Sequence, residues 1–198
     1  MKSAIIPQNE EERLRILDSY KILDTLPEED YDALAKIASA ICNTPIALIS
    51  LIDEERQWFK SNYGLGARHT PREFAFCAHS ILNPDEIFVV EDATKDERFF
   101  DNPLTINDPN VIFYAGAPLN TSEGQPLGTL CVIDNKPRKL DNEQKESLKL
   151  LAKQVVSLLE LRKKNLELEK TNTKVIQLNE QLNDFAYRLA HDLKSPIS

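Results

Sequence analysis

The N-terminal part of the chain carries apolar residues at helical spacing. Residues 8–23 predict a charged amphipathic helix, and Thr25-Leu26-Pro27-Glu28 is a capping box with an early proline, which predicts the start of a second helix. The apolar residues of this second helix, which we expect to be buried, are Tyr31, Leu34, Ile37, Ala38 and Ile41.

Short apolar runs separated by turn residues occupy the middle of the chain. Residues 45–53 are apolar on both faces and predict a central strand, and residues 57–63 predict its return partner. Further strands are expected over 87–90, 111–119 and 127–134, the last two joined by a hairpin at 122–125. A loop over 67–73 and a short helix over 74–82 complete this part. Hairpin-paired strands flanked by helices predict an α+β fold with an antiparallel sheet.

Helical spacing returns after a second capping box, formed by Asp141 and Gln144. The helix that it opens is expected to bury Leu148, Leu151, Val155 and Leu158. Beyond it, one column of apolar residues recurs every seven positions: Leu161, Leu168, Val175, Leu182 and Leu189. The companion column is Lys164, Thr171, Leu178 and Phe185. This is a parallel coiled-coil pattern with a polar first half, and it predicts a homodimer because the stripe has no partner within the chain.

Composition and charge narrow the possible partners. The chain has 198 residues and a net charge of −8, and residues 1–160 alone carry 17 basic and 27 acidic side chains. An acidic globular part argues against nucleic acid as a partner. No apolar run approaches the ~20 residues of a membrane span, and the N-terminus has no signal-peptide pattern. Cys42, Cys77 and Cys131 have no paired spacing, so we expect reduced thiols in a cytoplasmic protein.

Candidate chemistry lies near the C-terminus. On a helix, His191 points almost directly away from Leu189, whereas Arg188 and Ser195 fall near it. An exposed imidazole beside cations could accept an anionic group such as a phosphoryl group.

The run His191-Asp192-Leu193-Lys194-Ser195-Pro196 resembles the H-box of sensor histidine kinases. The resemblance implies that His191 is the phosphoacceptor, that Asp192 orients its ring, and that Ser195 stands where the family often carries a Thr or Asn for phosphatase work. ATP and Mg would be bound by a catalytic domain absent from this chain, and a response regulator receiver domain would be the partner. We therefore expect a piece of a longer kinase that is inactive alone.

The preceding part of the chain resembles the GAF domain, a small sensory fold related to PAS domains. The resemblance covers roughly residues 20–160 and rests on these segments: Leu23-Asp24-Thr25, 45–53, Arg56-Gln57-Trp58-Phe59-Lys60-Ser61, Pro71-Arg72-Glu73, Phe76-Cys77-Ala78-His79 and 128–134. Together with the H-box resemblance, it implies an N-terminal helix over 1–19, a GAF domain over 20–158, a signalling coiled coil over 159–182 and the start of a dimerisation and phosphoacceptor domain over 183–198.

A GAF domain can hold a small-molecule ligand between its sheet and helices, or fill that space with side chains. The candidate ligand-binding residues are Trp58, Arg72, Phe76, Cys77, His79, Phe113, Tyr114 and Cys131. Each is also explained as core or as a local ion pair, so a packed, unliganded pocket is at least as well supported. A bilin is not expected because Ala78 separates Cys77 from His79, and no metal site is expected. The cysteines look too scattered for a methionine-sulfoxide-reducing enzyme of this family.

Two hypotheses of different class remain. The chain is either the sensory and phosphoacceptor portion of a two-component histidine kinase, or a non-enzymatic GAF module for binding and dimerisation in which His191 is never phosphorylated.

Overall fold

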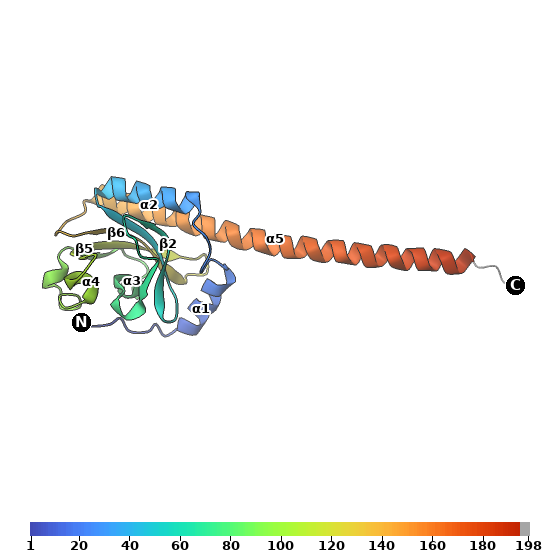
Figure 1. Cartoon of the computed structure of the whole chain (residues 1–198), viewed down its shortest axis with the longest axis horizontal. Coiled ribbons are helices and arrows are strands. Elements are labelled where there is room, and N and C mark those ends of the chain that lie inside the picture. Colours follow the sequence, from blue (N-terminus) through green and yellow to red (C-terminus); the bar gives the residue numbers. More distant parts are fainter. Residues whose placement is uncertain (195–198) are drawn as a thin grey trace. The chain divides into compact units, whose positions relative to one another are not determined.

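A computed structural model describes the backbone of residues 1–194 and the side chains of residues 1–191. The chain divides into two compact units, Met1–Glu160 and a second that starts at Leu161 (Figure 1).

The first unit is built on a six-stranded antiparallel sheet with the strand order β3-β2-β1-β6-β5-β4. Its strands are β1 (Ile46–Ile52), β2 (Arg56–Tyr63), β3 (His69–Pro71), β4 (Phe88–Val90), β5 (Phe113–Asn120) and β6 (Pro126–Asp134). The two central strands, β1 and β6, are distant in sequence and pair with Leu48 opposite Cys131. This arrangement confirms the α+β fold with an antiparallel sheet.

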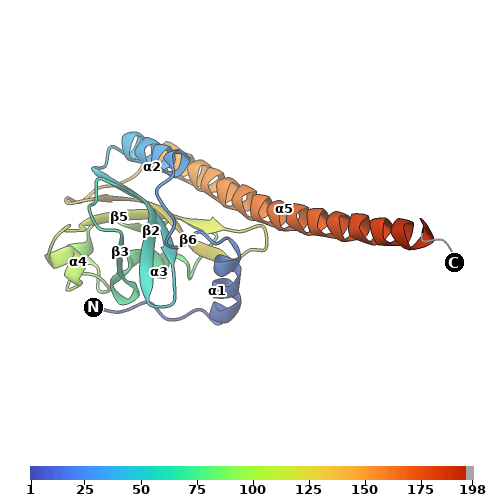
Figure 2. The same ribbon diagram turned by 45° about the vertical axis from the view of Figure 1, so that its right-hand side comes forward.

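Helices cover both faces of this sheet (Figure 2). They are α1 (Glu10–Ser19), α2 (Glu29–Cys42), α3 (Phe76–Ser80), α4 (Pro103–Ile106) and α5 (Asn142–Lys194), with 3₁₀ turns at Arg72–Phe74 and Ala93–Lys95. One face lies under α2 and residues 142–160 of α5, and the other face lies against α3 and the segments that follow it.

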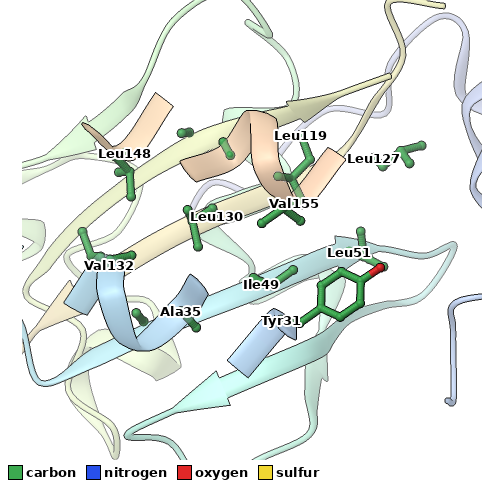
Figure 3. Close-up of a cluster of buried hydrophobic side chains, with 14 of the residues drawn as sticks. Tyr31, Ala35, Ile49, Leu51, Leu119, Leu127, Leu130, Val132, Leu148 and Val155 are labelled. Carbon is green, nitrogen blue, oxygen red and sulfur yellow. The ribbon is translucent and has the colours of Figure 1, made fainter. Parts of the chain in front are cut away.

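The main core lies between the sheet and the pair α2 and α5 (Figure 3). Ile49 and Leu51 of β1 point into it, whereas Leu48 and Ile52 belong to a second buried cluster on the opposite face. Because both faces of β1 are buried, its sequence is apolar throughout rather than alternating. The expected central strand is thus confirmed, together with its reason.

The capping box expected at the start of α5 is confirmed. The Asp141 carboxylate accepts a hydrogen bond from the Gln144 backbone N–H at 2.8 Å, and the Gln144 side chain accepts one from the Asp141 N–H at 3.2 Å. The hairpin between β5 and β6 also forms at the expected residues, with Gly124 at a φ of 77°.

The expected cap at Thr25 is wrong. α2 begins at Glu29 with no side-chain cap, and the Thr25 hydroxyl donates to the Ile22 carbonyl at 2.7 Å and accepts from the Lys60 ammonium at 2.9 Å. The Thr25 hydroxyl therefore does not cap α2, because it is engaged in a tertiary hydrogen bond with the buried Lys60.

The end of α1, the burial of two α2 residues and the loop before α3 also differ from what the sequence predicted. α1 is shorter than expected, because Lys21 and Asp24 adopt positive φ values of 47° and 59° that end the helical path. Ile37 and Ile41 of α2 are 45% and 37% exposed instead of buried. The expected loop over 67–73 contains β3, a short edge strand paired with β2.

In the second unit, residues 161–194 continue α5 as helix. The apolar column is exposed, with exposed fractions of 55% at Leu161, 67% at Leu168, 56% at Val175, 63% at Leu182 and 47% at Leu189. Among the residues that the structure describes, no helix is both long and apolar enough to cross a membrane.

Gly128 allows the close approach of the two central strands, and its replacement tests this packing. A Cβ at Gly128 would lie 1.9 Å from the backbone oxygen of Ser50 on β1, which no side-chain rotation relieves. We expect Gly128→Ala to lower the free energy of unfolding by about 3 kcal/mol, the upper end of the usual cost of overpacking, because the clash is with backbone. Gly66→Ala is the control, because a Cβ there meets nothing within 4 Å. Urea denaturation measures both variants, and equal stabilities would contradict the packing.

Candidate functional site

A cavity of about 210 Å³ lies on the sheet face opposite α2 and α5. Its wall is mainly apolar and is formed by Leu48, Phe59, Phe76, Val111, Tyr114 and Ile133, among others. The lining residues Gly66, Ala67 and Asp108 are exposed, so the mouth of the cavity lies beside them. A mostly apolar, largely preformed space with a few polar groups is typical of a small-molecule site.

Two polar side chains of the cavity wall each carry an oxygen atom without a hydrogen-bond partner among the described residues. Gln57 of β2 and Thr70 of β3 are directly opposite in the strand pairing, and both line the cavity. The buried oxygen atoms of the Gln57 amide and the Thr70 hydroxyl have no hydrogen bond within the part of the chain that the structure describes. An unsatisfied buried polar atom costs about 1–3 kcal/mol, so the pair is suited to bind a polar group inside the cavity.

A pair of thiols lies at the inner end of the cavity. Cys77 of α3 lines the space, and its sulfur lies 3.9 Å from the sulfur of Cys131 on β6. The hydroxyls of Thr129 and Tyr114 donate to the Cys77 sulfur at 3.0 and 3.1 Å. Gly116 leaves room for this arrangement, because a Cβ there would lie 2.2 Å from the Tyr114 hydroxyl.

These contacts make the two thiols unequal. Burial raises the pKa of the Cys77 thiol, but its hydrogen-bonding contacts, first of all with Cys131 and also with the Thr129 and Tyr114 hydroxyls, outweigh burial and lower the pKa below the ordinary value. Burial and the neighbouring Cys77 raise the pKa of Cys131, and burial likewise raises that of Tyr114. Cys77 is therefore the thiol that ionises first.

The structure brings together four of the eight candidate pocket residues. Phe76, Cys77 and Tyr114 line the cavity, and Cys131 contacts Cys77 directly behind its wall. The expectation that the three cysteines are scattered is wrong for Cys77 and Cys131; only Cys42 stands apart, in the core under α2.

The other four candidates lie elsewhere. Trp58 and Phe113 belong to the core on the opposite sheet face. The Arg72 guanidinium donates to the Glu10 carboxylate at 2.5 Å and to the Asp53 carbonyl at 2.9 Å, which ties α1 to the turn between β1 and β2. One His79 ring nitrogen lies 3.1 Å from the Lys2 carbonyl oxygen, and the ring meets Phe99 edge-on.

Sequence reasoning missed Gln57 and Thr70. The alternation along β2 could have indicated Gln57, because Trp58 and Lys60 face α2 while Gln57 and Phe59 face the cavity. Thr70 lies on β3, which was expected to be a loop.

The candidate phosphoacceptor His191 is exposed on α5. The side chain of Asp192 and all of Ser195 lie outside the described residues. Among the residues that are described, no group of three or more His, Cys, Asp or Glu side chains is arranged to hold a metal ion.

Comparison with known proteins identifies a family model and a curated relative that match this chain. The family model of the GAF domain matches residues 27–159. A cyclic di-GMP phosphodiesterase from Pseudomonas aeruginosa is 46% identical over 132 residues, which are 67% of this chain and 22% of that protein. The chain thus spans about a fifth of the length of the curated relative that it matches.

Similar solved structures support the fold alone, because their sequence identities are low. One is a domain of a protein described as a two-component sensor histidine kinase from Sinorhizobium meliloti, at 20% identity and a TM-score of 0.57, covering 71% of this chain and 96% of that one. Another is the GAF domain of an Acinetobacter phosphoenolpyruvate-protein phosphotransferase, at 18% identity and a TM-score of 0.55, covering 79% and 95%.

Replacement of Gln57 tests whether its amide is kept for a ligand. We expect Gln57→Leu to raise the free energy of unfolding of the ligand-free chain by about 1 kcal/mol, because it removes an unsatisfied buried polar atom. Ser39→Ala is the control, since the buried Ser39 hydroxyl donates to the Thr44 carbonyl at 2.5 Å and its loss should cost about 1 kcal/mol. Thermal and urea unfolding measure both. Destabilisation of the two variants by similar amounts would mean that Gln57 is structural.

Proposed function

The chain belongs to the GAF domain family, and on that premise we propose that it is the sensory and phosphoacceptor portion of a two-component histidine kinase. In this proposal residues 20–158 sense a small molecule in the cavity, residues 159–182 carry the signal as a coiled coil, and His191 receives the phosphoryl group. The observation that carries the proposal is the exposed apolar column of α5, which runs at seven-residue spacing to the turn that bears His191.

The column supports a parallel homodimer. Five large apolar side chains are 47–67% exposed, so burying what remains exposed would gain roughly 1–2 kcal/mol each, about half the value for a fully exposed side chain, and a second copy of the same helix offers the matching stripe. The companion positions Lys164 and Thr171 are polar, whereas Leu178 and Phe185 are apolar, so the second half of the seam is the more stable. A weak first half lets the coil adopt two arrangements, which a transmitting helix needs.

The position of His191 fits a phosphoacceptor. Residues two apart on a helix diverge by about 200°, so His191 points away from the seam position Leu189 and stays accessible in a dimer. A neutral imidazole has the free lone pair that attack on a γ-phosphorus requires. Asp192 is assigned as the group that orients the ring by its resemblance to the H-box. ATP and Mg would come from a catalytic domain, and a response regulator receiver domain would take the phosphoryl group onward.

The relative from P. aeruginosa bears the name of a phosphodiesterase, so the proposed histidine-kinase function depends on α5 and not on the GAF domain. The alternative is a GAF module that binds a small molecule and dimerises without any phosphoryl transfer. The two functions share the dimer and differ only at His191.

Substitution in the seam tests the dimer. Val175→Asp would bury a carboxylate between two helices, and we expect it to weaken dimerisation roughly a hundredfold or more. Gln177→Asp is the control, because it places the same side chain two residues away, off both columns. Sedimentation over a concentration series measures the dissociation constant. A Val175→Asp dimer as tight as the control would rule out this seam.

Phosphorylation at His191 is tested with a separately supplied histidine-kinase catalytic domain, ATP and Mg. We expect acid-labile phosphate on the chain, loss of the label to background in His191→Gln, and full labelling of His69→Gln, which changes the other exposed histidine. A folded dimer that takes no label, or a His191→Gln variant labelled like the unmodified chain, would leave the binding module as the function.

A further inference from the structure

We propose that Cys77 and Cys131 form a reversible redox site, in which a small hydroperoxide entering the cavity oxidises Cys77 and Cys131 then closes a disulfide with it. The observation behind it is the contact of two buried sulfurs at one end of a cavity that opens to solvent. The site is independent of the phosphoacceptor role, because it involves no residue of α5.

The distance between the sulfurs suits a dithiol. The 3.9 Å separation must shorten to about 2.05 Å when the disulfide forms, a closure of roughly 2 Å. Cys131 is held at the centre of the sheet, with Leu48 opposite on β1 and Gly116 opposite on β5. Cys77 lies on α3, a helix of five residues, so the closing movement falls on Cys77 and α3.

Access through the cavity determines the order of events. Cys77 is a lining residue, and the mouth beside Ala67 and Asp108 connects the cavity with solvent. A liquid water occupies about 30 Å³, so a cavity of about 210 Å³ admits hydrogen peroxide or a small alkyl hydroperoxide. Cys131 is fully buried and outside the lining, which shields it from direct attack by the oxidant.

The environment of Cys77 favours the thiolate, which is the reactive form of cysteine. The Thr129 and Tyr114 hydroxyls donate to the Cys77 sulfur at 3.0 and 3.1 Å, and these contacts stabilise negative charge there. The pKa of Cys77 is lowered by its hydrogen bonds against the effect of burial, whereas that of Cys131 is raised by burial. Cys77 is therefore the attacking thiol and Cys131 the resolving thiol.

The chemistry balances in two steps. The Cys77 thiolate attacks one peroxide oxygen, the O–O bond breaks, and the other oxygen leaves as water or alcohol after taking the thiol proton; Cys77 is then a sulfenic acid. The Cys131 sulfur next attacks the Cys77 sulfur, the S–O bond breaks, and the hydroxyl group leaves as water with the Cys131 proton. In total the two thiols lose two electrons and the peroxide gains them. An added dithiol reduces the disulfide and restores both thiols.

Closure of the disulfide would also reshape the cavity. Phe76 precedes Cys77, lines the cavity and stacks on Phe99 with ring centroids 3.9 Å apart. Movement of α3 toward β6 therefore displaces a wall of the cavity, so oxidation and ligand binding should affect each other.

The experiment treats the reduced full chain with one equivalent of hydrogen peroxide, alkylates the remaining thiols and maps peptides by mass spectrometry without reduction. We expect a cross-linked pair of peptides containing Cys77 and Cys131, reversible by dithiothreitol, with Cys42 fully alkylated. Cys42 is the internal control, because it lies alone in the opposite core and burial raises its pKa to about 11.

Variants separate the two roles. Cys42→Ser should form the same disulfide, Cys131→Ser should stop at a Cys77 sulfenic acid that dimedone traps, and Cys77→Ser should leave Cys131 reduced. Thr129→Val keeps both thiols but removes one hydrogen bond to Cys77, so we expect oxidation at neutral pH to slow by roughly threefold to tenfold. The proposal is overturned if the reduced, folded wild-type chain gives no Cys77–Cys131 disulfide, or if Cys42 is oxidised first. It is likewise overturned if Cys131 reacts equally fast in Cys77→Ser.

Discussion

The pairing of β1 with β6 is the constraint on which both halves of the first unit depend. These two central strands approach closely at Gly128 and bury both of their faces. Along β6, Leu130 and Val132 point into the core under α2 and α5, whereas Thr129 and Cys131 point to the cavity side. Because side chains alternate along a strand, one nine-residue segment supplies both the core and the candidate site.

This alternation offers a physical route for the proposed signal. Leu148 and Val155 of α5 share a buried cluster with Leu130, while the next residue, Cys131, contacts Cys77 on the other face. A change at the cavity that shifts the backbone of β6 would also shift the side chains packed against the start of α5, since a packed core is nearly incompressible. Residues 142–160 of the helix lie within the same compact unit as the cavity, so this first step needs no movement between units.

The sequence predicted those features whose causes are local. The central strand, the hairpin at Gly124 and the cap at Asp141 each depend on residues within a few positions of one another. The features that it missed depend on distant partners. The Thr25 hydroxyl binds Lys60, 35 residues away in the sequence, instead of capping α2. The strand β3 forms because it pairs with the edge of β2. Likewise, no spacing indicates that Cys77 and Cys131, 54 residues apart, lie in contact.

The buried polar side chains on the two faces of β2 differ in whether they are hydrogen-bonded. Lys60 faces α2, and its buried ammonium is satisfied by the Thr25 hydroxyl, the Leu26 carbonyl and the Glu28 carboxylate at 2.5–2.9 Å. Gln57 faces the cavity, and its buried amide oxygen has no protein partner among the described residues. If buried polar groups on β2 served stability alone, both would be paired, because an unpaired one costs more than an apolar replacement. A charged residue is fully satisfied on the α2 face while a neutral one is left open on the other face, and this difference supports the proposal that the cavity binds a polar group.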